Sequence, residues 1–383
     1  MLYLTEKREG VTTMTTEQRS SQAVAEKTLV IDADAHVVET ERTWEYMDPG
    51  EEKYRPVLSS PPDNPNQKFW SIAGKRRGFR FNALSVEAMK ERAEKTGRRF
   101  DTPEGTSDIH DVAMRLRAMD ETGIDVQILF NTLWIEHVAD DPAQDVAMAK
   151  SWNRWVAEAY KAANGRLYWN CVIPTLDIGA ALEQIEFAKE NGAVGVSIRP
   201  LEGDRVCTDT YFYPVFEKAQ ELNMCMGVHI ANGNPANVAL WRSGGGSGLA
   251  SFRGPTVLAC ATLLQSNLHK QFPGLRWGFV EASASWMPWL DSELAQRSGS
   301  RVHGEHTNAF AEHNIYVTCQ NEDDIPYLIA RGLIDSLVIG TDFGHFDASS
   351  DVDAISKFQN NPDLTAEQKR QILFENPKKL YGL

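Results

Sequence analysis

The sequence predicts an α/β fold, namely a (β/α)8 TIM barrel, and two observations carry this prediction. Eight short apolar runs typical of buried strands recur along the chain, and segments with helical spacing of apolar residues separate nearly all of them. This alternation implies parallel strands that are joined by right-handed crossovers. A length of 383 residues suits one large barrel, and eight repeated units favour a closed barrel over a doubly wound sheet.

The elements follow one another in a regular order after the first strand. We expect barrel strands at residues 29–34, 124–130, 167–173, 193–198, 224–230, 275–283, 314–320 and 336–343. We expect helices at residues 110–123, 147–164, 178–192, 213–223, 255–267, 285–297, 323–332 and 365–377. Gly123 and Gly192 stand where helices end, and Thr365 with Gln368 forms a capping box at the start of the last helix.

The chain divides into an arm and one domain. Residues 1–27 are polar and lack the apolar segment of a signal peptide, so we expect a flexible N-terminal arm. Residues 28–383 form the predicted barrel domain. Within it, residues 44–108 are rich in proline, glycine and charge. We expect an irregular insertion after the first strand, which is either a lid or a plain surface insertion.

Composition restricts the partners and the compartment. A net charge of −14 argues against nucleic acid or an anionic membrane as the main partner. We find no apolar run near the roughly 18 residues that a membrane span needs. The five cysteines form no C-x-x-C pair, so we expect buried free thiols and a cytoplasmic protein.

Ionisable residues stand at the ends of the expected strands. Asp34 and His36 follow the first strand at alternate positions, so both can face one spot, where they suit a divalent metal. A barrel builds its site at the carboxyl ends of its strands. Unpaired buried charges cost several kcal/mol each, and a bound cation removes that cost. The sequence therefore predicts a metal centre, with further candidates at the other strand ends: Asn131, Arg199, His229, Glu281, Cys319, Gln320, Asp342 and His345.

Five motifs resemble those of the amidohydrolase superfamily, in the branch that includes aminocarboxymuconate-semialdehyde and resorcylate decarboxylases. They read IDADAH, GVHI, FPGLRWGFVEASASWMPWL, GTDFGHFD and ENPKKLYGL, and the resemblance extends over about residues 29–383. It implies that Asp34, His36, His229 and Asp342 hold a divalent ion. Zinc is the first expectation, and manganese and iron are the alternatives. The resemblance also implies a homodimer.

Two positions depart from the family pattern. Asp34 stands where the family usually has His or Glu, which keeps an oxygen ligand. Glu281 stands where the decarboxylases have His. Glu281 would either join the ligands, serve as a base, or support a ligand from outside. It is also compatible with a two-metal site, because a carboxylate can bridge two ions.

The leading functional hypothesis is metal-assisted hydrolysis of a small carbonyl compound. The substrate would be a cyclic or aromatic ester, lactone or amide, or a compound with a C–C bond next to a ketone. Asp342 would move the proton of an activated water, and His229 or Arg199 would stabilise the oxyanion.

The alternatives are non-oxidative decarboxylation of an aromatic or dienoic acid, hydration, and a non-catalytic binding barrel. Arg199 supports decarboxylation and Glu281 counts against it. We expect Arg199, Trp286, Phe343 and His345 to contact the substrate. The alternatives are an ion pair for Arg199, a core position for the two aromatic residues, and a surface position for His345.

Overall fold

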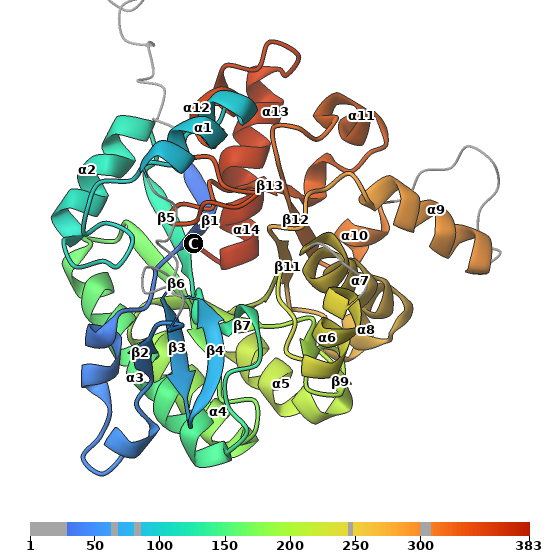
Figure 1. Ribbon diagram of the computed structural model, residues 1–383. Coiled ribbons are helices and arrows are strands. Elements are labelled where there is room, and N and C mark those ends of the chain that lie inside the picture. The colour runs from blue at the N-terminus through green and yellow to red at the C-terminus, as the bar shows by residue number, and fades with distance from the viewer. Residues whose placement is uncertain (1–28, 63–67, 80–85, 244–247, 299–307) are drawn as a thin grey trace, which may run out of the picture.

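The computed structural model describes residues 29–62, 68–79, 86–243, 248–298 and 308–383, and the arm expected at 1–27 lies outside them. Its centre is an eight-stranded parallel sheet surrounded by helices (Figure 1). Each strand pairs with the next in chain order, which confirms the predicted (β/α)8 barrel. The strands are β1 (Ile31–His36), β5 (Val126–Phe130), β6 (Leu167–Val172), β7 (Ala193–Ile198), β10 (Cys225–His229), β11 (Trp277–Val280), β12 (Ile315–Cys319) and β13 (Leu337–Ile339).

The ring closes between β1 and the segment that follows β13. The carbonyl of Asp34 accepts hydrogen bonds from the amides of Thr341 (3.1 Å) and Asp342 (2.9 Å). The two segments approach closely because residue 340 is a glycine: a Cβ there would lie 2.3 Å from the Cβ of Asp34. The closure therefore brings Asp34 and Asp342, which are far apart in the sequence, to the same edge of the barrel.

Helices cover the outside of the barrel. Two predicted boundaries are confirmed: Gly123 ends α2 with a left-handed φ of 74°, and Thr365 with Gln368 forms the capping box of α13. The predicted last helix differs, because a five-residue π-helical turn separates α13 from α14 just before Pro377, which has no amide hydrogen to donate. The main helices are α2 (Val112–Thr122), α3 (Pro142–Ala162), α4 (Ile178–Glu190), α5 (Tyr213–Glu221), α6 (Pro235–Ser243), α7 (Gly254–Gln265), α9 (Met287–Ser298), α11 (Ile325–Ala330), α12 (Ala354–Gln359), α13 (Ala366–Arg370) and α14 (Asn376–Tyr381).

The insertion after β1 contains regular structure, which corrects the expectation of an irregular segment. Its antiparallel sheet consists of β2 (Val57–Ser59), β3 (Phe69–Ile72) and β4 (Lys75–Phe79), and α1 (Val86–Thr96) follows. The high content of proline and glycine reflects the short turns between these elements rather than an absence of structure. Trp70 of β3 is buried against Trp44, with ring centroids 5.8 Å apart, and Trp44 packs in turn against Trp134 after β5, with centroids 6.3 Å apart. These contacts anchor the insertion to the barrel.

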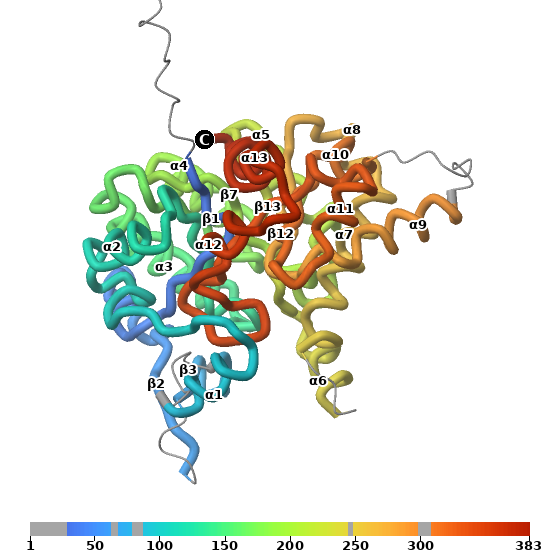
Figure 2. Tube along the Cα trace, turned by 90° about the horizontal axis from the view of Figure 1, so that it is seen from above, coloured from blue at the N-terminus to red at the C-terminus, as the bar shows by residue number. Residues whose placement is uncertain are grey.

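The insertion and α6 lie at one end of the molecule, opposite the C-terminus of the chain (Figure 2). This is the end at which the barrel strands finish. All five cysteines are buried and free, as expected. Among the described helices, none combines the length and the apolar character that a bilayer crossing requires.

Candidate metal centre

The centre begins with two histidines whose protons are fixed by backbone carbonyls. His36, at the end of β1, has its Nδ1 3.0 Å from the carbonyl oxygen of Asn131. His229, at the end of β10, has its Nδ1 3.2 Å from the carbonyl oxygen of Ile230. A carbonyl can only accept, so each Nδ1 carries the proton and each neutral ring points an Nε2 lone pair inward. The two Nε2 atoms lie 3.0 Å apart, and a cation between them removes the repulsion.

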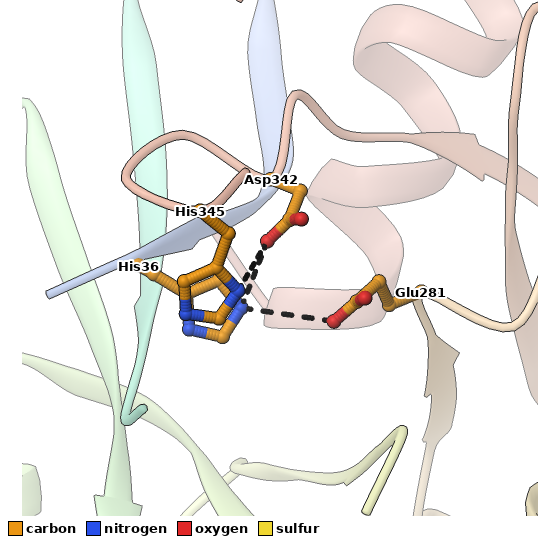
Figure 3. A group of neighbouring side chains, drawn as sticks. All are labelled: His36, Glu281, Asp342 and His345. Atoms are coloured by element: carbon orange, nitrogen blue, oxygen red, sulfur yellow. Dashed lines mark ion pairs between the residues drawn. The ribbon is translucent and has the colours of Figure 1, made fainter. Parts of the chain in front are cut away.

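Three carboxylates face the same point. The Oδ1 atom of Asp34 lies 3.6 and 3.5 Å from the Nε2 atoms of His36 and His229. The Oε2 atom of Glu281 lies 3.4 Å from Nε2 of His229, and Oδ1 of Asp342 lies 3.3 Å from Nε2 of His36 (Figure 3). All three oxygens are buried, and none has a hydrogen-bond partner among the described residues.

Such a donor set fits a divalent cation. Ligand atoms about 2.1 Å from one ion lie roughly 3.0–3.5 Å apart, as most of these atoms do. Two imidazoles and three carboxylates are ligands that zinc, manganese and iron accept. The structure therefore brings together all five residues that the sequence predicts as ligands. Because its Nε2 carries no proton in the neutral ring, His229 suits the ligand role better than the predicted role of oxyanion donor.

The backbone is strained at two of these residues. Glu281 has a φ of 66° and Asp342 a φ of 51°, in the left-handed region that non-glycine residues rarely adopt. The amide of Glu281 donates to Oγ1 of Thr318 (2.6 Å), and the amide of Asp342 donates to the carbonyl of Asp34 (2.9 Å). Such conformations cost about 1–3 kcal/mol each and cluster at functional sites.

Burial changes the acidity of the centre. Desolvation, followed by the charge of Asp342, raises the pKa of Glu281 well above its ordinary value. Desolvation likewise raises the pKa of Asp342 and lowers that of His36. These directions all express the cost of charge in a dry site without a cation, and a bound divalent ion reverses the direction for the carboxylates.

His345 supports the centre from one side. Its ring stacks on His36 with centroids 3.7 Å apart, and its Nδ1 lies 2.9 Å from Oδ1 of Asp342 (Figure 3). Its Nε2 lies 2.9 Å from Oγ1 of Thr132, whose hydroxyl donates to the carbonyl of Val37. The threonine oxygen can therefore only accept from His345, which places a proton on Nε2. His345 is buried, which excludes the surface position weighed as its alternative.

An inner cavity of about 20 Å³ adjoins the centre, and this is room for about one water molecule. His36, His229 and His345 form its polar side together with Asn131 and Ser197. The lining also includes five apolar side chains: Trp134, Ile135, Val172, Ile173 and Ile198.

Arg199 lines this cavity but is already engaged. Its Nε and Nη2 atoms donate to one oxygen of Glu202 at 2.9 and 2.5 Å, and its Nη1 donates to the carbonyl of Glu136 at 2.7 Å. Both side chains of the ion pair are buried. The structure thus shows the ion pair that was weighed as the alternative, and contact with a substrate stays a prediction.

Two predicted substrate residues do not reach the inner cavity. Trp286 is partly buried and packs against Phe310, with centroids 6.0 Å apart. Phe343 is buried with the guanidinium of Arg115 3.8 Å from its ring centroid. Neither is among the described residues that line the inner cavity, and contact of either side chain with a substrate stays a prediction.

Sequence reasoning missed four residues that contact the site. Thr132 holds His345, Glu202 neutralises Arg199, and Ser350 donates to Oδ2 of Asp342 at 2.6 Å. The negative charge of Asp347 contributes to the raised pKa of Glu281, after burial and the charge of Asp342. Asp347 could have been predicted from the sequence, because it is the last residue of the motif that contains Asp342.

Comparisons with known proteins identify the family of the chain and agree with its fold. A sequence model of the family described as Amidohydrolase matches residues 31–383. Over 176 residues the chain is 26% identical to the 2-keto-4-carboxy-3-hexenedioate hydratase of Sphingobium sp. SYK-6. This match covers 43% of the chain and 49% of the hydratase, so the chain spans about half the length of this curated relative.

Several solved structures have the same fold. An amidohydrolase from Mycobacterium avium subsp. paratuberculosis superposes with a TM-score of 0.73 at 17% identity, covering 94% of this chain and 100% of that one. The 2,6-dihydroxybenzoate decarboxylase from Rhizobium gives 0.63 at 15% identity, covering 93% and 99%. The 5-carboxyvanillate decarboxylase from Novosphingobium aromaticivorans, solved with manganese, gives 0.59 at 17% identity, covering 78% and 93%.

Proposed function

The chain belongs to the amidohydrolase family, and from this premise we propose that it is a metal-dependent hydrolase of a small cyclic or aromatic carbonyl compound. The observation that carries the proposal is the convergence of two imidazole nitrogens and three carboxylate oxygens beside a cavity with room for one water. A divalent ion held there supplies Lewis acidity and lowers the pKa of water toward neutrality. Zinc is the first candidate, with manganese and iron as alternatives.

Asp342 is the proposed proton carrier. Its Oδ1 faces the centre, while Ser350 holds its Oδ2 with a hydrogen bond of 2.6 Å. In this position Asp342 takes a proton from water and delivers it to the leaving group. The Nδ1 atom of His345 is 2.9 Å from the same Oδ1 and can accept the proton that Asp342 receives. Glu281 adds a third carboxylate, and a base beside the water favours water chemistry over protonation of a ring carbon.

Decarboxylation is the second candidate. The fold is shared with two metal-dependent or aromatic-acid decarboxylases, although at identities that establish the fold alone. The pairing of Arg199 with Glu202 weakens this candidate, because the guanidinium that would hold a substrate carboxylate is already neutralised. Hydration is the third, and the curated relative is named as a hydratase.

One experiment separates the three reactions. The protein, loaded with zinc or manganese, is incubated in ¹⁸O-labelled water with a panel of lactones, esters, amides, enones and hydroxybenzoates. Hydrolysis gives bond cleavage with ¹⁸O in a product, and hydration gives ¹⁸O without cleavage. Two results together would overturn hydrolysis in favour of decarboxylation. A hydroxybenzoate would release carbon dioxide, and no carbonyl substrate would give a product that contains ¹⁸O from the water.

We also propose that the protein acts as a homodimer. Large apolar side chains are exposed on and beside α6 and α7, namely Leu240, Trp241, Leu249 and Leu258. Such a patch is typical of an interaction surface. Light scattering coupled to size-exclusion chromatography tests this, and a monomer at micromolar concentration would contradict it.

A further inference from the structure

A second and larger cavity lies on the same end of the barrel as the metal centre. Its volume is about 560 Å³, compared with about 20 Å³ for the inner cavity. β4 of the insertion contributes Arg76 and Arg77, and α6 contributes Val238 and Arg242. Figure 2 shows α6 and the insertion, labelled there at β2, β3 and α1, at this end of the molecule. We call this space the outer cavity.

One backbone bridge separates the outer cavity from the inner one. Glu136 pairs with Asn232 in an isolated bridge, and the amide of Asn232 donates to the carbonyl of Ile135 at 2.8 Å. Glu136 and Asn232 line the outer cavity. Their chain neighbours Ile135 and Ala231 line the inner cavity. A ligand in the outer cavity therefore lies one layer of chain away from the metal centre.

The outer cavity is basic, although the chain carries a net charge of −14. Among the described residues that line it, three are arginines and one is a carboxylate, Glu136. Glu136 forms an ion pair with Arg242, whose side chain is 53% exposed. The guanidinium of Arg76 lies 4.5 Å from the ring centroid of Phe69, a contact that holds it at the cavity.

A second carboxylate, Asp140, is shared among several cations at the edge. It lies 2.6 Å from both Nζ of Lys75 and Nη2 of Arg77, and 2.7 Å from Nε2 of His137. Burial lowers the pKa of His137, so this ring adds no charge. Lys75 and Arg77 share the one carboxylate, so one positive charge is left over on the β4 side. Anions are attracted to such a concave basic surface.

We propose that the outer cavity binds an oxyanion group, a carboxylate or a phosphate, at the distal end of a substrate that passes beside the Glu136–Asn232 bridge and places its reactive end at the metal centre. Arginine is suited to this task because its planar fork of N–H groups matches both oxyanions. The inner cavity is too small for a whole substrate, whereas the outer cavity has room for a side chain or a second ring. The assignment to the substrate rests on the proposed function, but the anion site does not depend on it.

The first test measures binding without catalysis. Succinate and inorganic phosphate are titrated separately into protein freed of metal, at low salt, by isothermal titration calorimetry. Arg242→Gln and Arg77→Gln should each weaken binding about tenfold, which is the loss expected for one charge-assisted hydrogen bond. Glu136→Gln should tighten binding, because it removes the carboxylate that competes for Arg242. The stronger of the two probes identifies the oxyanion.

A matched control comes from α9. Arg297 is exposed and pairs with Glu293, as Arg242 pairs with Glu136, but it does not line the cavity. Arg297→Gln should leave both affinities unchanged. The proposal is overturned if neither probe binds, if Arg242→Gln binds as well as the wild type, or if Arg297→Gln weakens binding equally.

The second test concerns the substrate. Once a substrate is known, Arg242→Gln should raise KM about tenfold for an anionic substrate with kcat unchanged, and should leave KM unaltered for its neutral amide analogue. Anion binding without any change in KM would overturn the assignment to the substrate while leaving the anion site. Anion binding to a protein that shows no hydrolysis would contradict the proposed function alone.

Discussion

The Nδ1 atom of His345 lies 2.9 Å from Oδ1 of Asp342, and the other nitrogen of the same ring donates to Thr132. A neutral His345 therefore points a lone pair at a carboxylate oxygen, and a proton is needed between them in the metal-free protein. Burial raises the pKa of Asp342 and lowers that of His345, so this proton belongs to Asp342. A metal ion at Oδ1 replaces the proton, which links metal binding to the charge of the proposed base.

Asp342→Asn should lower kcat by about 10²–10⁴, which is the usual contribution of a positioned proton carrier. The amide keeps the shape and the contact with Ser350, but it cannot take a proton from water. Metal content is measured on the same preparation by elemental analysis. A variant that keeps its metal and turns over at the wild-type rate would show that Asp342 does not transfer the proton.

Thr132→Val should lower kcat about tenfold without loss of metal, because it removes the acceptor that fixes the ring of His345. The pH profile of kcat should also shift, since a ring without a fixed tautomer holds its proton differently. Thr122→Val is the control, because Thr122 is another buried threonine and bonds only to the carbonyls of its own helix. An unchanged pH profile in Thr132→Val would argue that His345 is positioned by packing alone.

His229→Ala should abolish stoichiometric metal binding. The wild type should contain one equivalent of zinc, manganese or iron, or two if Glu281 bridges a second ion. His110→Ala is the control, because His110 is exposed on a loop and contacts Arg42. A wild-type protein that binds none of the three metals after reconstitution would contradict the metal centre. The five residues would then form a polar network.

The barrel and its metal centre could be predicted from sequence because both depend on local patterns. Each strand contains a short apolar run, and Asp34, His229, Glu281 and Asp342 follow such runs directly or within three residues of their ends. The carboxyl ends of parallel strands meet at one edge, so residues placed there converge without further information.

Contacts between loops could not be predicted in the same way. The pairing of Arg199 with Glu202 and the contact of Thr132 with His345 depend on how loops of variable length fold over the barrel. The direction of Phe343 depends on one turn of the backbone after β13, which places it against Arg115 rather than in the cavity. The sheet in the insertion was hidden because its strands are only three to five residues long and because one of them, β4, is mostly basic.

Glu39→Gln should make stability less dependent on pH between about 4.5 and 7. Burial raises the pKa of Glu39 from 4.5 to about 7, so the folded state holds its proton more tightly than the unfolded state. The contribution of Glu39 to the free energy of unfolding is therefore largest at low pH. It falls by roughly 3 kcal/mol as the pH rises through this window.

The measurement is urea denaturation at pH 5 and pH 8. The variant should lose more stability at pH 5 than at pH 8, because at the higher pH the wild type already bears the cost of a buried charge. The carboxylate also accepts from the amides of Thr132 and Leu133 and from the indole of Trp152, so the variant is destabilised at both. Glu45→Gln, at an exposed position of the neighbouring 3₁₀ helix Glu41–Tyr46, should leave stability unchanged at both pH values. Equal losses at both pH values would contradict the ionisation of Glu39.

Glu281→Gln should stabilise the metal-free protein and destabilise the metal-bound protein, each relative to the wild type. In the metal-free protein Glu281 is one of three carboxylates that face one point, and burial followed by the charge of Asp342 raises its pKa. The amide removes that repulsion, so the metal-free variant should melt a few degrees above the metal-free wild type at pH 8. With saturating zinc the wild type should melt higher, because the carboxylate binds the ion and the amide binds it weakly. Calorimetry with and without EDTA measures both, and a shift of the same sign in the two conditions would place Glu281 outside the metal site.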